Sequence, residues 1–161
     1  MTTWGVTGHM NLGLSTRRLV AQDLTAKLSA ELTPGQPLVG LTCLAAGADQ
    51  VFTWVVAALG GDLVFVRPCA RIEETVTGAD LLGMRAGAAL AVETDDLPFD
   101  EPSNAAYAAA NAKVLARCDA LVAVWDGGPS AGQGGTAETV EYARSQSKRV
   151  LVIWPEGAVR G

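Results

Sequence analysis

Histidines, cysteine pairs and runs of basic residues are scarce in this chain of 161 residues. There is one histidine, and the three cysteines, Cys43, Cys69 and Cys118, are far apart and form no C-x-x-C pair. A zinc site needs several closely spaced His or Cys ligands, so we expect no metal site. Unpaired cysteines in an odd number favour a reduced, cytoplasmic setting, in which each thiol is a small core residue.

Basic residues are outnumbered, with 12 Lys and Arg against 17 Asp and Glu, which gives a net charge of −5. Because nucleic-acid binding normally depends on a basic patch, we expect no DNA or RNA partner. No apolar run approaches the roughly 20 residues that cross a bilayer, and no charged leader precedes the first apolar run, so we expect no membrane partner. With 49% hydrophobic and 18% charged residues, the composition is typical of a folded globular protein.

Short aliphatic runs alternate with amphipathic or Ala-rich stretches along the whole chain. The aliphatic runs predict strands at residues 4–7, 38–43, 63–66, 120–125 and 150–154, and a brief strand at 91–93. The stretches between them predict helices at 15–32, from a tight loop at 45–49 to about 59, and at 79–91, 104–117 and 136–145. A short helical piece at 71–77 and a loop at 95–102 complete the middle of the chain. This pattern predicts one α/β domain over residues 1–161, a three-layer, doubly wound, mainly parallel sheet with helices on both faces.

Three loops that follow predicted strands carry unusual residues, and ligands bind beyond the carboxyl ends of strands in such sheets. We expect these loops to meet at one rim and to bind a nucleotide or a related ribose phosphate, with no further cofactor. Small residues there let backbone N–H groups approach a phosphate, and the start of a helix adds donors and a partial positive charge. The candidate binding residues are Thr7, Gly8 and His9; Gly47, Ala48 and Asp49; and Asp126, Gly127, Gly134, Gly135 and Thr136.

Each candidate also has a simpler interpretation. Gly8 can shape the end of a strand, His9 can be a capping or surface residue, and Asp49 can be a first-turn acid favoured by the helix dipole. The Walker A and G-x-G-x-x-G patterns are absent, so neither a P-loop NTPase nor a standard dinucleotide fold is supported. Trp125 could stack on a base or simply pack, and residues 154–157 are not expected to reach the site.

The motifs Gly5-Val-Thr-Gly-His9, Leu44-Ala-Ala-Gly-Ala-Asp49 and Asp126-Gly, followed by Gly135-Thr-Ala-Glu138, resemble those of one superfamily. It is the SLOG superfamily of Rossmann-like nucleotide-binding domains, which includes LOG-like and DprA-like domains. The pattern that runs from Asp126 to Tyr142 is also similar, more distantly, to that of nucleoside 2-deoxyribosyltransferases. The resemblance implies a cytoplasmic nucleotide-binding domain that forms a homodimer or a higher homo-oligomer.

The same resemblance implies a catalytic carboxylate for cleavage of an N-glycosidic bond, at the position of Thr139. Glu138 stands one residue early, and one residue turns a side chain by about 100° around a helix. A threonine hydroxyl cannot replace that carboxylate. Asp126 and Glu138 are weak catalytic candidates, and no catalytic residue is assigned. Met10 stands where relatives carry an arginine that pairs with phosphate, and Arg17 or Arg18 would have to replace it.

These observations leave three hypotheses. The first is a sensory or regulatory domain that binds a nucleotide without converting it. The second is a nucleotide N-glycosidase, a phosphoribohydrolase or a glycosyl transferase, with Asp126 or Glu138 in an unfamiliar role. The third is a non-catalytic scaffold subunit. The mismatch at Thr139 favours the first hypothesis, so we lean towards a protein that is not an enzyme.

Overall fold

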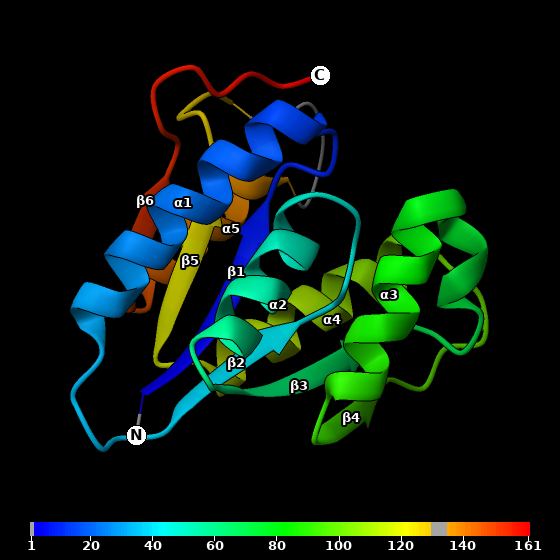
Figure 1. Cartoon of the computed structure of the whole chain (residues 1–161). Helices are drawn as coiled ribbons and strands as arrows, with labels where there is room; N and C mark the ends of the chain where they lie inside the picture. Colours follow the sequence, from blue (N-terminus) through cyan, green and yellow to red (C-terminus); the bar gives the residue numbers. More distant parts are fainter. Residues whose placement is uncertain (1, 130–134) are drawn as a thin grey trace.

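The computed structural model describes residues 2–129 and 135–161, and its centre is a parallel sheet (Figure 1). The sheet has six strands in the order β4-β3-β2-β1-β5-β6, and every neighbouring pair is parallel. The strands are β1 (Thr2–Gly8), β2 (Leu38–Thr42), β3 (Asp62–Arg67), β4 (Glu93–Asp96), β5 (Ala120–Val124) and β6 (Arg149–Ile153). The predicted α/β, doubly wound architecture is confirmed, with a sheet that is parallel throughout.

Helices cover both faces of this sheet, with α1 and α2 on one side and α4 and α5 on the other (Figure 1). The helices are α1 (Leu14–Glu31), α2 (Ala48–Ala58), the short 3-10 helix η1 (Ile72–Thr75), α3 (Gly78–Leu90), α4 (Asn104–Arg117) and α5 (Thr136–Ser145). Trp4 and Phe52 belong to the core under α1 and α2, whereas Val114 and Ala143 belong to the core under α4 and α5. All five residues of β5 are buried, because this central strand is covered on both faces.

The strand order reverses between β1 and β5. From β1 the chain proceeds outward through β2, β3 and β4, and it then returns to the other side of β1 to form β5 and β6. Gly8 and Val124 are paired in register at the carboxyl ends of these two strands. Since α1 leaves β1 towards one face and α5 leaves β5 towards the other, this boundary is the position at which such sheets bind ligands.

Strand β4 differs from the sequence prediction. We expected a brief strand at 91–93 and a loop from 95, but Glu93–Asp96 pairs with β3. Three of its four residues are acidic, so no aliphatic run marks it. Arg117 binds Glu93 at 2.8 Å and Asp95 at 3.0 Å, and Arg67 binds Asp96. These ion pairs offset the charge of an edge strand, a position where charged residues are common.

Two predictions from composition also concern the fold. Cys69 and Cys118 are buried, Cys43 is partly buried, and all three are free thiols, in agreement with their predicted role as small core residues. Among the residues that the structure describes, no helix combines the length and the apolar character that crossing a bilayer requires.

Candidate functional site

The loop after β1 begins as a packed junction between elements. A Cβ atom on Gly8 would lie 2.5 Å from the Cβ of Ala48 and 2.7 Å from the carbonyl oxygen of Val124. His9 N donates to Val124 O at 3.1 Å, and His9 O accepts from Ala48 N at 3.1 Å. Thr7 is half-buried within β1. The glycine at Gly8 is therefore required by packing within the protein itself.

The loop after β2 is packed against the loop after β1. Gly47 has a φ of +79°, and a Cβ atom there would lie 2.5 Å from Met10 O and 2.6 Å from His9 O. Any other residue would combine backbone strain with a clash, so glycine is needed at this turn. Ala48 is fully buried, and its backbone N–H is already bonded to His9. The residues of this loop therefore pack against the loop after β1 and support it.

Asp49 is buried in the same loop, with 9% of its surface exposed. Its Oδ2 accepts a hydrogen bond from Cys43 N at 3.2 Å, and the backbone N–H of Ala45 also bonds to it. Burial raises the pKa of Asp49 to about 7, against the opposing effect of the bonds from Ala45 and Cys43. Its side-chain contacts lie within the β2–α2 loop, away from the other two loops.

Asp126 follows β5 and has a different environment. Its Oδ1 accepts from Gly128 N at 2.9 Å and lies 3.3 Å from His9 Nε2, while Oδ2 lies 3.6 Å from Arg160 Nη1. The bond from Gly128, and less strongly the charge of Arg160, lowers the pKa of Asp126. The side chain is 26% exposed, so it presents a carboxylate to solvent at neutral pH. Gly127 has a φ of +84° with no atom near its Cβ position, so this turn is open.

His9 is 8% exposed and lies against Asp126. The backbone N–H of Asp126 donates to His9 Nε2 at 3.2 Å, and this nitrogen also lies 3.3 Å from Asp126 Oδ1. One nitrogen cannot accept from the amide and donate to the carboxylate at once. Burial, and then the charge of Arg160, lowers the pKa of His9. We therefore assign the neutral ring, with Nε2 as the acceptor and the proton on Nδ1.

Residues after β6 complete this cluster. The ring of Trp154 packs edge-on against His9 with the centroids 5.5 Å apart. Figure 1 shows the end of the chain, in red, passing over the beginning of α1. From the sequence we expected no role for residues 154–157, yet this segment packs on His9 and leads to Arg160. More than 100 positions separate His9 from these residues, so no local sequence pattern could reveal the contact.

Helices α1 and α5 begin on either side of this cluster. Each starts after a glycine, Gly13 or Gly135, with extended backbone, and among the described residues no side chain caps either helix. In the same described part of the chain, helices α2 and α3 also lack a side-chain cap, whereas Ser103 caps α4 through its hydroxyl. Uncapped helix starts offer N–H donors and a partial positive charge to an anion. Thr136 is the first residue of α5, whereas the candidate Gly134 lies outside the described residues.

The region of the expected catalytic carboxylate lies on α5. Thr139 is 8% exposed, and its hydroxyl donates to Gly135 O at 3.1 Å within the first turn. Glu138, one residue earlier, is exposed. The hydroxyl of Thr139 is therefore bonded to the helix backbone. The side chain of Glu138 leaves the helix about 100° around its axis from that of Thr139.

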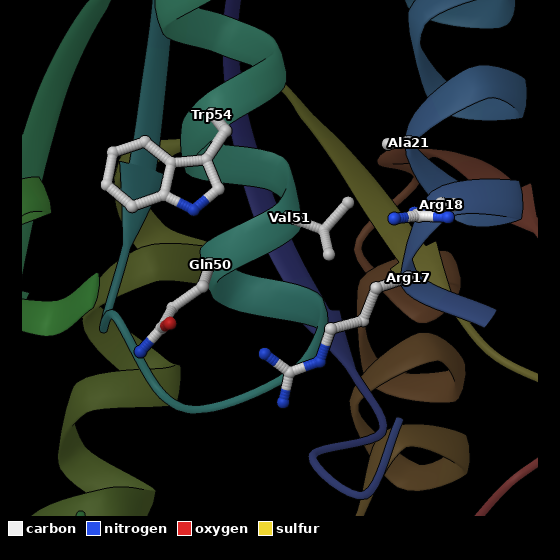
Figure 2. A pocket seen from close by; sticks show the side chains of 6 residues that line it. All are labelled: Arg17, Arg18, Ala21, Gln50, Val51 and Trp54. Atoms are coloured by element: carbon white, nitrogen blue, oxygen red, sulfur yellow. The ribbon is translucent and has the colours of Figure 1, made fainter. Parts of the chain in front are cut away.

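A groove between α1 and α2 was not predicted from the sequence. It encloses about 210 Å³ and is lined by Arg17, Arg18, Ala21, Gln50, Val51 and Trp54 (Figure 2). Arg17 donates to Leu12 O at 2.8 Å and to Asp80 Oδ1 at 3.2 Å, and Gln50 donates to Asp80 O at 2.8 Å. These bonds connect α1 and α2 with α3. Arg17 is therefore held by other groups and does not replace the arginine that the β1–α1 loop lacks.

A second hollow, of about 410 Å³, lies between the loop after β5 and α5. Trp125 forms part of its wall, and the indole N–H of Trp125 donates to Gly128 O at 2.8 Å. This bond holds the ring against its own loop. The other lining residues are Gly127, Gly128, Pro129, Ala137, Val140, Glu141 and Arg144.

Comparison with known proteins supports the fold class of the chain. No family model matches the chain, and no curated protein matches it in sequence. Among solved structures, DNA processing protein A (DprA) from Streptococcus pneumoniae has a TM-score of 0.66 at 16% identity, over 98% of this chain and 52% of that protein. DprA from Helicobacter pylori, described with a single-stranded DNA binding mode, has a TM-score of 0.64 at 15% identity, over 98% and 67%. The protein TM1055 has a TM-score of 0.56 at 15% identity, over 93% and 72%.

The chain therefore has the predicted Rossmann-like fold, similar to that of these DprA proteins, and it spans about half the length of the Streptococcus pneumoniae protein. The more distant likeness to nucleoside 2-deoxyribosyltransferases is not supported by these structures. One prediction is wrong. We excluded nucleic acid as a partner, but the Helicobacter pylori DprA, whose structure is similar, is described with a single-stranded DNA binding mode. A net charge of −5 describes the whole chain, whereas a phosphate responds to the local field at its binding site.

Proposed function

We propose that the chain binds a phosphorylated nucleotide beyond the carboxyl ends of β1 and β5 and does not convert it. The observation that carries this proposal is the pair of helices, α1 and α5, that begin there at Gly13 and Gly135 without a side-chain cap among the described residues. Phosphate oxygens would accept hydrogen bonds from their first N–H groups. Between these helices, the exposed carboxylate of Asp126 can accept hydrogen bonds from ribose hydroxyls.

The predicted binding residues divide into two groups in this proposal. Those expected at the ligand are His9, Asp126, Gly127, Gly135 and Thr136. Those that shape the surrounding loops are Thr7, Gly8, Gly47 and Ala48. Asp49 is not included, because its side-chain bonds remain within the β2–α2 loop.

The nucleotide could be free or part of a single strand of nucleic acid, since both present a sugar and a phosphate. The likeness to a DprA that binds single-stranded DNA is the reason for including the second source. Binding without conversion is what a sensory or regulatory domain requires, and this is the role that we propose for either ligand.

Turnover is disfavoured by the chemistry of the candidate residues. The hydroxyl of Thr139 is bonded to Gly135 O, so no carboxylate stands at the position that N-glycosidic cleavage would use. Asp126 has a lowered pKa, which makes it a poor general acid for a leaving base at neutral pH. Both observations favour a binding protein over a glycosidase or a glycosyl transferase.

One experiment separates the three hypotheses. The protein is incubated with nucleoside monophosphates, ADP-ribose and a single-stranded thymidine oligonucleotide, and the Tm and the released base are both measured. We expect at least one ligand to raise the Tm with no base released, because a ligand at 100 times its Kd stabilises the native state by about 2.7 kcal/mol. Base release that Asp126→Asn abolishes would contradict the proposal and favour an enzyme. An unchanged Tm with every ligand would contradict it and favour a scaffold.

A further inference from the structure

Among the described residues, one positively charged side chain lies near the cluster of His9 and Asp126, and it comes from a distant part of the chain. Met10, which follows His9 directly, is apolar and 62% exposed. Arg17 is bonded to Leu12 O and Asp80. Arg160 instead brings its guanidinium to 3.6 Å from Asp126 Oδ2.

The backbone of Arg160 is fixed on both sides. Thr16 Oγ1 donates to Val159 O at 3.0 Å and accepts from Val159 N at 3.1 Å. Gly161 N donates to Asn11 O at 2.8 Å. The side chain between these anchors is 39% exposed, so the guanidinium can move while its backbone stays beside the start of α1.

The pair between Arg160 and Asp126 is loose. Charge-assisted N–H···O bonds are about 2.7–2.9 Å long, so a separation of 3.6 Å leaves most of the donor capacity of this arginine unused. An exposed ion pair stabilises a protein by at most about 1 kcal/mol. A phosphate offers more charge than a carboxylate, with three oxygens arranged for the forked donors of a guanidinium.

We propose that Arg160 is the cation of the phosphate site, and that the ligand phosphate replaces Asp126 as its partner. This inference rests on the proposed function and names the side chain that binds its phosphate. Once Arg160 turns to the phosphate, the carboxylate of Asp126 is free to accept from a ribose hydroxyl. A nucleoside 5′-monophosphate has both groups within reach of one another.

The first test compares a nucleotide with its nucleoside. Arg160→Gln is expected to weaken the binding of adenosine monophosphate about tenfold, the loss of one charge-assisted contact, and not to weaken the binding of adenosine. Arg149→Gln is the matched control, because Arg149 is an exposed arginine on β6 that pairs with Glu31. Equal affinity of Arg160→Gln and the natural protein for the monophosphate would overturn the proposal.

The second test needs no nucleotide, because His9 is the only histidine and the proton on its Cε1 gives one NMR signal. Since the charge of Arg160 lowers the pKa of His9, Arg160→Gln should raise that pKa and Arg149→Gln should not. Saturating inorganic phosphate should also raise it in the natural protein, and much less in Arg160→Gln. Nucleotide binding without either effect overturns the role of Arg160 alone. If no nucleotide binds but phosphate still acts through Arg160, the proposed function fails and the anion site stands.

Discussion

The loops that follow β2 and β5 both carry a glycine beside an acid, but they differ in what surrounds these residues. After β2, Gly47 lies against the carbonyl oxygens of Met10 and His9, and Asp49 is buried within its own loop. After β5, the turn at Gly127 is open, and the carboxylate of Asp126 is 26% exposed. Two similar sequence patterns therefore have different uses, one in the fold and the other in a candidate site.

The order of strands explains this difference. Strand β2 lies between β1 and β3, and the helices that follow β1 and β2 pack on the same face of the sheet. The loops before α1 and α2 therefore pack against each other. At the boundary of β1 and β5, α1 and α5 diverge to opposite faces, and the carboxylate of Asp126 stays partly exposed there. A glycine and an acid after a strand predict a ligand site only where the helices diverge.

The largest expected effect concerns Asp49. Its pKa of about 7 in the folded protein lies above its ordinary value of 3.8, so the folded state favours the protonated carboxyl. The protonated carboxyl makes its whole contribution to the free energy of unfolding below about pH 4. This contribution, on the order of 4 kcal/mol, is lost as the pH rises to about 7. Asp49→Asn should remove this dependence and leave nucleotide affinity unchanged. Urea unfolding of both proteins between pH 4 and 8 measures this dependence. If the free energies of unfolding of the two proteins changed with pH in the same way, the account would be contradicted.

The next effect compares two glycines with positive φ. Gly47→Ala should lower the free energy of unfolding by about 3 kcal/mol or more, because backbone strain adds to contacts of 2.5 Å and 2.6 Å with two carbonyl oxygens. Gly127→Ala is the matched control, with similar φ but open space, and should lose only about 1 kcal/mol. Thermal unfolding checks both. Equal losses would mean that the loop after β2 is not packed as described.

A smaller effect is expected at Asp126. Asp126→Asn should change the free energy of unfolding by less than about 1 kcal/mol, since its ion pair with Arg160 is partly exposed. Adenosine should bind about fivefold more weakly, because an amide is a poorer acceptor for ribose hydroxyls than a carboxylate. Inorganic phosphate should bind slightly more tightly, since Arg160 loses its competing partner. Isothermal titration with both ligands tests this, and a loss of phosphate affinity would reverse the proposed roles.

The parallel sheet was predictable because its central strands are continuous aliphatic runs buried on both faces. The meeting of His9 with Asp126 was also predictable, since both follow strands that end at one rim. The role of Asp49 was not, because sequence alone does not say which loop is covered by its neighbour. Strand β4 was missed because its acidic residues depend on the distant partners Arg67 and Arg117. Arg160 was missed for the same reason, as its position depends on long-range packing.

The central claim is that the uncapped start of α1 holds the phosphate of a nucleotide, and Gly13 offers the most direct test. Its backbone, with φ −69° and ψ 168°, suits a capping residue, and a Cβ there meets no atom within 4 Å. Gly13→Asp should cap α1 and raise the free energy of unfolding by about 1 kcal/mol. The negative charge of the new side chain should weaken nucleoside monophosphate binding by about tenfold or more. Gly13→Ala is the control and should bind as the natural protein does. A Gly13→Asp variant that is more stable and binds the nucleotide equally well would contradict the claim.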